Sequence, residues 1–154
     1  MPATPSVLFV CLGNICRSPM AEGAFRQLAQ AARIPVECDS AGTGNWHVGE
    51  APDLRAQAAV ARNGGDISGA RARQVRLQDF YDFTHIIALD STNLRDLKRL
   101  RPSDATADLS LLLDHVPGRA GQAVADPYYG DAAGFDVTWQ DVAAGAKALL
   151  AKLA

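Results

Sequence analysis

Short apolar runs alternate along this chain with longer amphipathic segments. Residues 6–10 and 84–89 are apolar and rich in β-branched side chains, which is typical of strands buried on both faces of a sheet. Residues 35–39 form another strand candidate, followed by a loop over residues 40–49. A weaker candidate lies within residues 107–112. The pattern therefore predicts up to four short strands.

The segment between the first two strands has the pattern of a helix. Over residues 17–33, apolar side chains recur at helical spacing in Met20, Ala24, Leu28 and Ala31. This spacing places them on one face, which predicts an amphipathic helix packed against the sheet.

Four more segments are expected to be helical. Asp53 and Asp90 are suited to the N-cap position, because a carboxylate there accepts hydrogen bonds from the free N–H groups of the first turn. The helix after Asp53 ends at an Asn-Gly-Gly run, and the helix after Asp90 ends before a proline. The predicted spans are residues 53–62, 77–81, 90–101 and 135–153.

The alternation of strands and helices defines the expected fold class. It predicts an α/β fold in which a parallel sheet is flanked by helices on both faces. No repeat, linker or low-complexity tract divides the chain, so we expect a single domain over residues 1–154. Ligands of such sheets bind beyond the carboxyl ends of the strands, and Cys11 lies at the end of the first strand.

The composition and charge of the chain argue against several classes of function. A net charge of −2 and a pI near 5.8 give no indication of a nucleic-acid partner. No apolar run approaches the roughly 18 residues of a membrane-spanning helix, so no membrane insertion is expected. Residues 1–5 lack the pattern of a signal peptide, and three cysteines do not pair evenly into disulfides. We therefore expect a cytoplasmic protein.

The loop after the first strand, Cys11-Leu-Gly-Asn-Ile-Cys-Arg-Ser, carries the candidate chemistry. It leads into a helix start, where backbone N–H groups lack partners and the helix dipole favours an anion. Gly13 and Asn14 tolerate the positive φ of a curled loop. Arg17 can grip two phosphate oxygens. These features predict a phosphate-binding loop with a nucleophilic thiolate at Cys11.

A thiolate that attacks phosphorus needs two kinds of assistance. Ser18 can donate a hydrogen bond to the sulfur and ease its later departure as a leaving group. The leaving oxygen needs a proton donor, and Asp126 is the best candidate. It precedes Pro127, which restricts it to an extended conformation. The adjacent Tyr128 and Tyr129 would suit stacking on a ring-bearing substrate.

These motifs resemble those of the low-molecular-weight protein tyrosine phosphatases over essentially the whole chain. The shared motifs are Val10–Pro19, Ser40–Thr43, Trp46–Gly49, Ala72–Val75, Asp90–Asp96 and Asp126–Gly130. The first and last of them, in this order and at this separation, are highly specific. The resemblance implies a flavodoxin-like three-layer sandwich with a four-stranded parallel sheet of order 2-1-3-4. It also implies hydrolysis of protein phosphotyrosine and small aryl phosphates through a cysteinyl-phosphate intermediate.

The resemblance assigns roles to single residues. It implies that Cys11 is the nucleophile, that Arg17 binds the phosphate and the transition state, and that Asp126 is general acid and then base. Ser40 is implied to support the loop through hydrogen bonds. The residues implied to bind the phosphate or the ring are Leu12, Gly13, Asn14, Ile15, Cys16, Ser18, Trp46, Tyr128 and Tyr129.

The remaining cysteines and histidines complete the candidate chemistry. Cys16 resembles the second cysteine of the family, which implies a reversible disulfide with Cys11 that protects the nucleophile from irreversible oxidation. His47, His85 and His115 have no metal-ligand spacing and are interpreted as isolated structural or surface residues. Neither a metal nor another cofactor is expected.

Two other functions stay open at this point. A thiol-linked arsenate reductase can use the same loop and fold, but it needs a further cysteine pair, and the chain has only Cys38 besides Cys11 and Cys16. A non-catalytic phosphopeptide-binding module would need neither a nucleophile nor an acid. The expected partners are tyrosine-phosphorylated protein substrates and a tyrosine kinase, and we expect a monomer or weak self-association.

Overall fold

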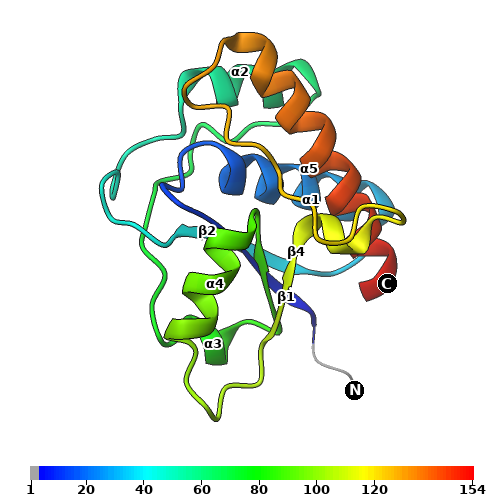
Figure 1. The fold of residues 1–154 in the computed structure, drawn as a ribbon. Coiled ribbons are helices and arrows are strands. Elements are labelled where there is room, and N and C mark those ends of the chain that lie inside the picture. Colours follow the sequence, from blue (N-terminus) through cyan, green and yellow to red (C-terminus); the bar gives the residue numbers. More distant parts are fainter. Residues whose placement is uncertain (1–3) are drawn as a thin grey trace.

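A four-stranded, all-parallel sheet lies between two layers of helices in the computed structural model, which describes residues 4–154 (Figure 1). The strands are β1 (Ser6–Cys11), β2 (Glu37–Gly42), β3 (His85–Ala88) and β4 (Asp108–Leu111). Their order is β2-β1-β3-β4, which confirms the expected fold class and strand order. Part of the opening segment 1–5, in which no signal peptide is expected, lies outside the described residues.

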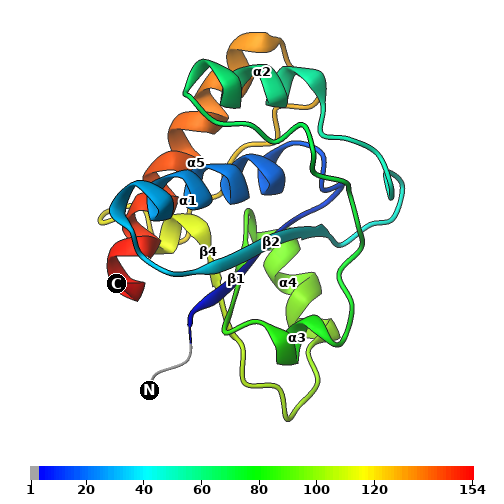
Figure 2. The ribbon, with the colours of Figure 1, turned by 180° about the vertical axis from the view of Figure 1, so that it is seen from behind.

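The helices divide between the two faces of the sheet. α1 and α5 cover one face and α3 and α4 cover the other, while α2 packs against α1 and α5 beyond the end of the sheet (Figures 1 and 2). Their bounds, with the short 3-10 helix η1, are α1 (Arg17–Ala32), α2 (Leu54–Arg62), α3 (Asp79–Asp82), α4 (Ser91–Leu100), η1 (Leu112–His115) and α5 (Ala132–Leu153).

Strand β1 is central in the sheet and buried on both sides. Val7 and Phe9 belong to the core beneath α1 and α5, whereas Leu8 and Val10 belong to the core beneath α3 and α4. Successive side chains of a strand point to opposite faces, so a continuous apolar run is what two covered faces require. The strand therefore holds Cys11 at a fixed position at its carboxyl end.

Several predicted boundaries are wrong. β2 runs on to Gly42, which pairs with Cys11, so Ser40 lies in a strand rather than at the start of a loop. The reason is pairing along the whole of β1, which local sequence does not reveal. α5 begins at Ala132 instead of residue 135, because the side chain of Asp131 accepts a hydrogen bond from the N–H of Gly134 and caps the helix.

The buried face of α1 also differs from the predicted one. Met20 and Ala24 are buried as expected, but Ala31 is exposed, and Phe25 and Ala29 are buried in its place. α1 is covered by α5 as well as by the sheet, so its apolar face is broader than one line of residues. α3 starts two positions later than expected, at Asp79, and η1 has no counterpart among the predicted helices.

Within residues 4–154, none of the helices combines the length and apolar content needed to cross a bilayer.

Candidate active site

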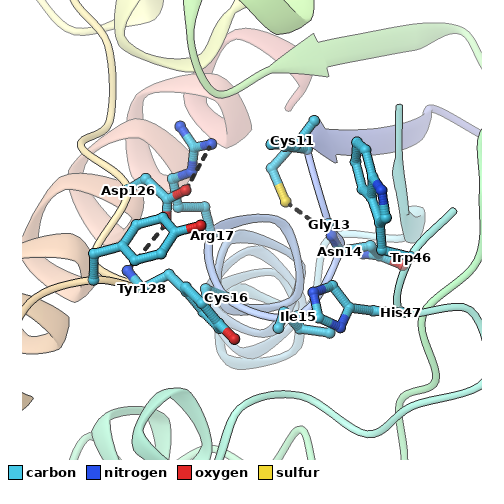
Figure 3. A pocket seen from close by; sticks show the side chains of 12 residues that line it. Cys11, Gly13, Asn14, Ile15, Cys16, Arg17, Trp46, His47, Asp126 and Tyr128 are labelled. Carbon is cyan, nitrogen blue, oxygen red and sulfur yellow. Dashed lines mark hydrogen bonds and ion pairs between the residues drawn. The ribbon is translucent and has the colours of Figure 1, made fainter. Parts of the chain in front are cut away.

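The loop after β1 forms the floor of a cavity of about 340 Å³ at the carboxyl end of the sheet (Figure 3). The cavity is lined by Cys11, Leu12, Gly13, Asn14, Ile15, Cys16, Arg17, Trp46, His47, Asp126, Tyr128 and Tyr129. Of the residues expected at the site, only Ser18 and Ser40 do not line it, because they lie behind the loop. Segments far apart in sequence thus meet at the sulfur of Cys11.

The thiol of Cys11 is buried and hydrogen-bonded within its own loop. Its Sγ accepts from the backbone N–H of Asn14 at 3.3 Å and lies 3.0 Å from the hydroxyl oxygen of Ser18. The side-chain amide of Asn14 already donates to that oxygen at 2.8 Å. The Ser18 hydroxyl can therefore donate its one proton either to the sulfur at 3.0 Å or to the carbonyl of Ala41 at 3.5 Å, and the sulfur is the nearer acceptor. This arrangement stabilises negative charge on the sulfur.

Asn14 is the connecting residue of the loop. Its Oδ1 accepts the backbone N–H of Arg73 at 3.0 Å, which fixes the orientation of the amide. The Nδ2 atom then faces the hydroxyls of Ser18 and Ser40 at 2.8 and 2.9 Å. Asn14 has a φ of 60°, in the left-handed region that residues other than glycine seldom adopt.

The two turn residues of the loop play different parts. The sequence suggested positive φ for both Gly13 and Asn14, but only Asn14 adopts it. Gly13 instead leaves space for His47, since a Cβ there would lie 3.0 Å from a carbon of the His47 ring and would crowd it.

The guanidinium of Arg17 is 4% exposed and held at its inner end. Nη1 donates to Oδ2 of Asp90 at 2.7 Å and to the carbonyl of Val124 at 3.0 Å. Asp90 also caps α4 through the N–H of Asn93, so α4 and the guanidinium share one carboxylate. Across residues 4–154, neither Nε nor Nη2 of Arg17 has a hydrogen-bond partner. These donors are the ones a phosphate would use.

The start of α1 leaves its N–H groups free. Its N-cap residue, Cys16, makes no side-chain capping hydrogen bond, and the first turn carries no acidic residue. A helix start without a cap keeps its partial positive charge and its donors for a ligand. The loop and α1 therefore form a site for an anion of the size of phosphate.

Asp126 faces this site from the opposite wall. One of its oxygens, Oδ2, lies 3.8 Å from Nη2 of Arg17, and Oδ1 accepts the backbone N–H of Tyr128 at 3.1 Å. Its side chain is 40% exposed, so it can exchange protons with solvent. Figure 3 shows Asp126 and Tyr128 on one side of the cavity and Trp46 on the other.

Arg55 of α2 ties the segment that carries Asp126 to the rest of the site. It donates to the carbonyls of Tyr128 and Gly130, both at 3.0 Å, and forms two hydrogen bonds to Asp53. The backbone N–H of Asp53 in turn donates to the carbonyl of Ile15 at 2.8 Å. Arg55 and Asp53 therefore connect the segment that carries Asp126 to the loop that carries Cys11.

Cys16 is the second cysteine of the loop and is also buried. Burial raises the pKa of its thiol, and the neighbouring carboxylate of Asp53 raises it further. Cys16 therefore stays protonated at neutral pH, whereas Cys11 holds the position that favours a thiolate.

Aromatic rings form the walls of the cavity. Tyr128 and Tyr129 meet edge to face with centroids 4.9 Å apart, and the ring of His47 lies 6.3 Å from that of Tyr128. Trp46 is 68% exposed and stands opposite. The cavity between these rings suits a flat aromatic group.

Four residues of the site are not assigned to it by the sequence. From the sequence, Asp90 is expected only as a helix cap and Arg55 has no assigned role. Arg73 belongs to an arginine-rich stretch that is interpreted as a solvated face, and His47 is interpreted as an isolated structural or surface residue. The resemblance motifs include Asp90, Arg73 and His47, and this is the one signal that could have identified them. Arg55 acts through backbone carbonyls, which leave no pattern in the sequence.

Fold and site together define an α/β protein with an anion-binding cysteine loop. A family model described as low molecular weight phosphotyrosine protein phosphatase matches residues 6–154. The chain belongs to this family.

Similar proteins span nearly the same length. A low molecular weight protein-tyrosine-phosphatase of Bacillus subtilis, YfkJ, is 43% identical over 150 residues, covering 96% of this chain and 95% of the relative. A low molecular weight phosphotyrosine protein phosphatase of Homo sapiens is 41% identical over 154 residues, covering 97% and 96%. The crystal structure of an Entamoeba histolytica protein tyrosine phosphatase superposes with a TM-score of 0.92 at 32% identity, covering 97% of each chain.

Proposed function

We propose that this chain hydrolyses phosphotyrosine in proteins, with Cys11 as nucleophile, Arg17 as phosphate ligand and Asp126 as general acid and base. The observation that carries the proposal is the shared cavity. It brings the hydrogen-bonded Sγ of Cys11 to the same site as the free donors of Arg17 and the carboxyl of Asp126. A pure binding module has no use for a nucleophile facing an acid.

In the first step the Cys11 thiolate attacks phosphorus. The S–P bond forms while the bond from phosphorus to the phenolic oxygen breaks, and Asp126 gives its proton to that oxygen. Nη2 and Nε of Arg17, with the N–H groups at the start of α1, hold the phosphoryl oxygens as charge develops on them. The tyrosine product leaves a cysteinyl-phosphate.

In the second step water attacks the phosphorus of the cysteinyl-phosphate. Asp126, now a carboxylate, takes a proton from the water, and the S–P bond breaks. The electron pair returns to Sγ, where the hydroxyl of Ser18 and the N–H of Asn14 stabilise the thiolate. Phosphate leaves and the site returns to its starting state.

The rings around the cavity support an aryl substrate. Trp46, His47 and Tyr128 leave room between them for a planar group above the phosphate site. The Entamoeba histolytica relative was crystallised with Hepes in its active site. Hepes carries a sulfonate, which is tetrahedral and anionic like a phosphate.

The direct test is an assay on p-nitrophenyl phosphate and on a phosphotyrosyl peptide, in excess chelator. We expect hydrolysis of both at undiminished rates, because no step uses a metal. Loss of activity on chelation, or arsenate reduction with a thiol that exceeds phosphatase turnover, would overturn the proposal. Tight phosphopeptide binding without hydrolysis would favour the binding module instead.

Replacing Arg55 with lysine tests how the acid is positioned. Lysine keeps the charge but cannot hold Asp53 and the carbonyls of Tyr128 and Gly130 together. We expect kcat for an aryl phosphate with a poor leaving group to fall about tenfold, the cost of a small displacement of a catalytic group.

Leaving-group dependence distinguishes this role from a general loss of structure. An activated aryl phosphate needs less help from the acid, so the Arg55→Lys variant should hydrolyse it at close to the normal rate. Arg62→Lys is the matched control, since Arg62 lies on the same helix and pairs with Asp136 on the surface. If kcat fell equally for both substrates in Arg55→Lys, Arg55 would not be a positioning residue for the acid.

We propose a reversible disulfide between Cys11 and Cys16. Peroxide oxidises the Cys11 thiolate to a sulfenic acid, and the Cys16 sulfur then displaces water to form the disulfide. Because the pKa of Cys16 is raised, we expect disulfide formation to accelerate as pH rises above neutral. After treatment with peroxide, dithiothreitol should restore the activity of the wild type. It should not restore the activity of a Cys16→Ser variant treated in the same way. Full recovery of that variant would contradict the role of Cys16.

The remaining proposals concern domain, location and partners. The family match over residues 6–154 supports a single domain for the whole chain. The three cysteines are free, which supports a cytoplasmic location. The proposed substrates are proteins phosphorylated by a tyrosine kinase, and we propose that the chain is monomeric or associates weakly. Size-exclusion chromatography across a range of concentrations tests the last point.

A further inference from the structure

A second hollow adjoins the candidate catalytic cavity on the far side of Trp46. It has a volume of about 300 Å³ and lies between the loop after β2 and the C-terminal half of α4. It is lined by Leu12, Thr43, Gly44, Trp46, Asp96, Arg99 and Leu100. Leu12 and Trp46 line the catalytic cavity as well, so the two spaces are continuous along one wall. We call it the flanking hollow.

The shared wall is held in place by backbone contacts. Gly44 donates its N–H to the carbonyl of Leu12 at 2.9 Å, which fastens the loop after β2 to the loop of Cys11. The ring of Trp46 lies directly on Gly44, and a Cβ at this position would come within 1.8 Å of a ring carbon. Any side chain at position 44 would displace the indole. Gly44 therefore leaves room for the indole of Trp46, which stands as a partition between the two spaces.

The surface of the flanking hollow is mainly apolar. Leu12, Trp46 and Leu100 are 43%, 68% and 43% exposed, which leaves three large apolar side chains in contact with solvent around one depression. Asp96 and Arg99 border it with an ion pair of 3.8 Å. Exposed apolar side chains gathered around a hollow are typical of a binding surface.

We infer that the flanking hollow binds the substrate polypeptide itself, taking an apolar side chain two positions from the phosphotyrosine. The inference rests on the proposed function. A polypeptide whose phosphotyrosine fills the catalytic cavity must cross the cavity rim, and Trp46 and Leu12 form one side of that rim.

The spacing follows from strand geometry. In an extended peptide, side chains two residues apart point the same way and lie about 6.6 Å apart along the chain. When the phosphotyrosine lies on one side of the Trp46 ring, the side chain two residues away in the peptide therefore lies on the other side of that ring. There it packs against Leu12, Trp46 and Leu100, which makes Leu100 a residue that determines substrate specificity.

The test compares kcat/KM for phosphotyrosyl peptides that carry leucine or alanine two positions before or two positions after the phosphotyrosine. We expect leucine to be preferred about tenfold at one of the two positions, which is the gain from partial burial of one leucine side chain. The position that shows the preference gives the direction of the bound peptide. In a Leu100→Ser variant the preference should disappear.

Two controls separate the possible outcomes. Leu77→Ser makes the same change at an exposed leucine that lines neither space, and it should keep the preference. Hydrolysis of p-nitrophenyl phosphate, which reaches only the catalytic cavity, should be the same in both variants. Absence of the leucine preference in the wild type, or its persistence in Leu100→Ser, would overturn the inference alone. Failure of the wild type to hydrolyse any of these substrates would overturn the proposed function as well.

Discussion

Replacing Cys11 with serine is expected to abolish turnover, with kcat falling about 10⁴-fold or more. The hydroxyl of serine has nearly the size of the thiol, but it does not ionise near neutral pH. The N–H of Asn14 and the hydroxyl of Ser18 stabilise an anion at this position only if one forms. The measurement is steady-state hydrolysis of p-nitrophenyl phosphate and of a phosphotyrosyl peptide.

The same variant should still bind phosphate. The donors of Arg17 and the uncapped start of α1 are unchanged by the substitution. Inorganic phosphate or vanadate titrated into Cys11→Ser, followed by a thermal shift, checks that the site is intact. A variant that binds phosphate normally and retains turnover within tenfold of the wild type would exclude Cys11 as the nucleophile.

Replacing Asp126 with asparagine gives the second large effect. The amide keeps the shape of the carboxyl group but cannot donate a proton to the phenolic oxygen or take one from water. We expect kcat for phosphotyrosine to fall by about 10² to 10⁴, the usual contribution of general acid–base catalysis. The guanidinium of Arg17 is held by hydrogen bonds to Asp90 and Val124 and makes none to Asp126, so binding of phosphate should change much less than kcat.

The leaving group separates the acid role of Asp126 from its base role. The phenolate of a strongly acidic phenol can leave without being protonated. With such an aryl phosphate, the cysteinyl-phosphate should therefore form at a nearly normal rate in Asp126→Asn. Hydrolysis of the cysteinyl-phosphate should remain slow. Stopped-flow absorbance should then show a burst in which one molecule of phenol is released per active site. A uniform loss on good and poor leaving groups with no burst would contradict the assignment.

The fold was predictable because its signals are local. β1 is a continuous apolar run, and α2 and α4 are capped by Asp53 and Asp90, whose side chains accept backbone hydrogen bonds as expected. The end of β2 was not predictable in the same way. Residues 40–42 have the composition of a loop, and they become a strand because they pair with β1.

The site divides along a similar line. Cys11, Arg17 and Ser18 lie within eight residues of one another, so a loop that leads into a helix is enough to indicate that they are close in space. The contacts of Arg17 with Asp90 and of Arg55 with the segment 128–130 join residues more than 70 positions apart. These contacts form only when the chain folds, so they cannot be predicted from the periodicity or the composition of the sequence.

The most direct test of the central claim is identification of the phosphorylated residue during turnover. Asp126→Asn enzyme mixed with excess aryl phosphate, quenched in acid and digested, should carry one phosphoryl group on the peptide that contains Cys11, with fragmentation placing it on that sulfur. A phosphoryl group on another residue would contradict the claim. So would normal turnover with no phosphorylated enzyme at any quench time.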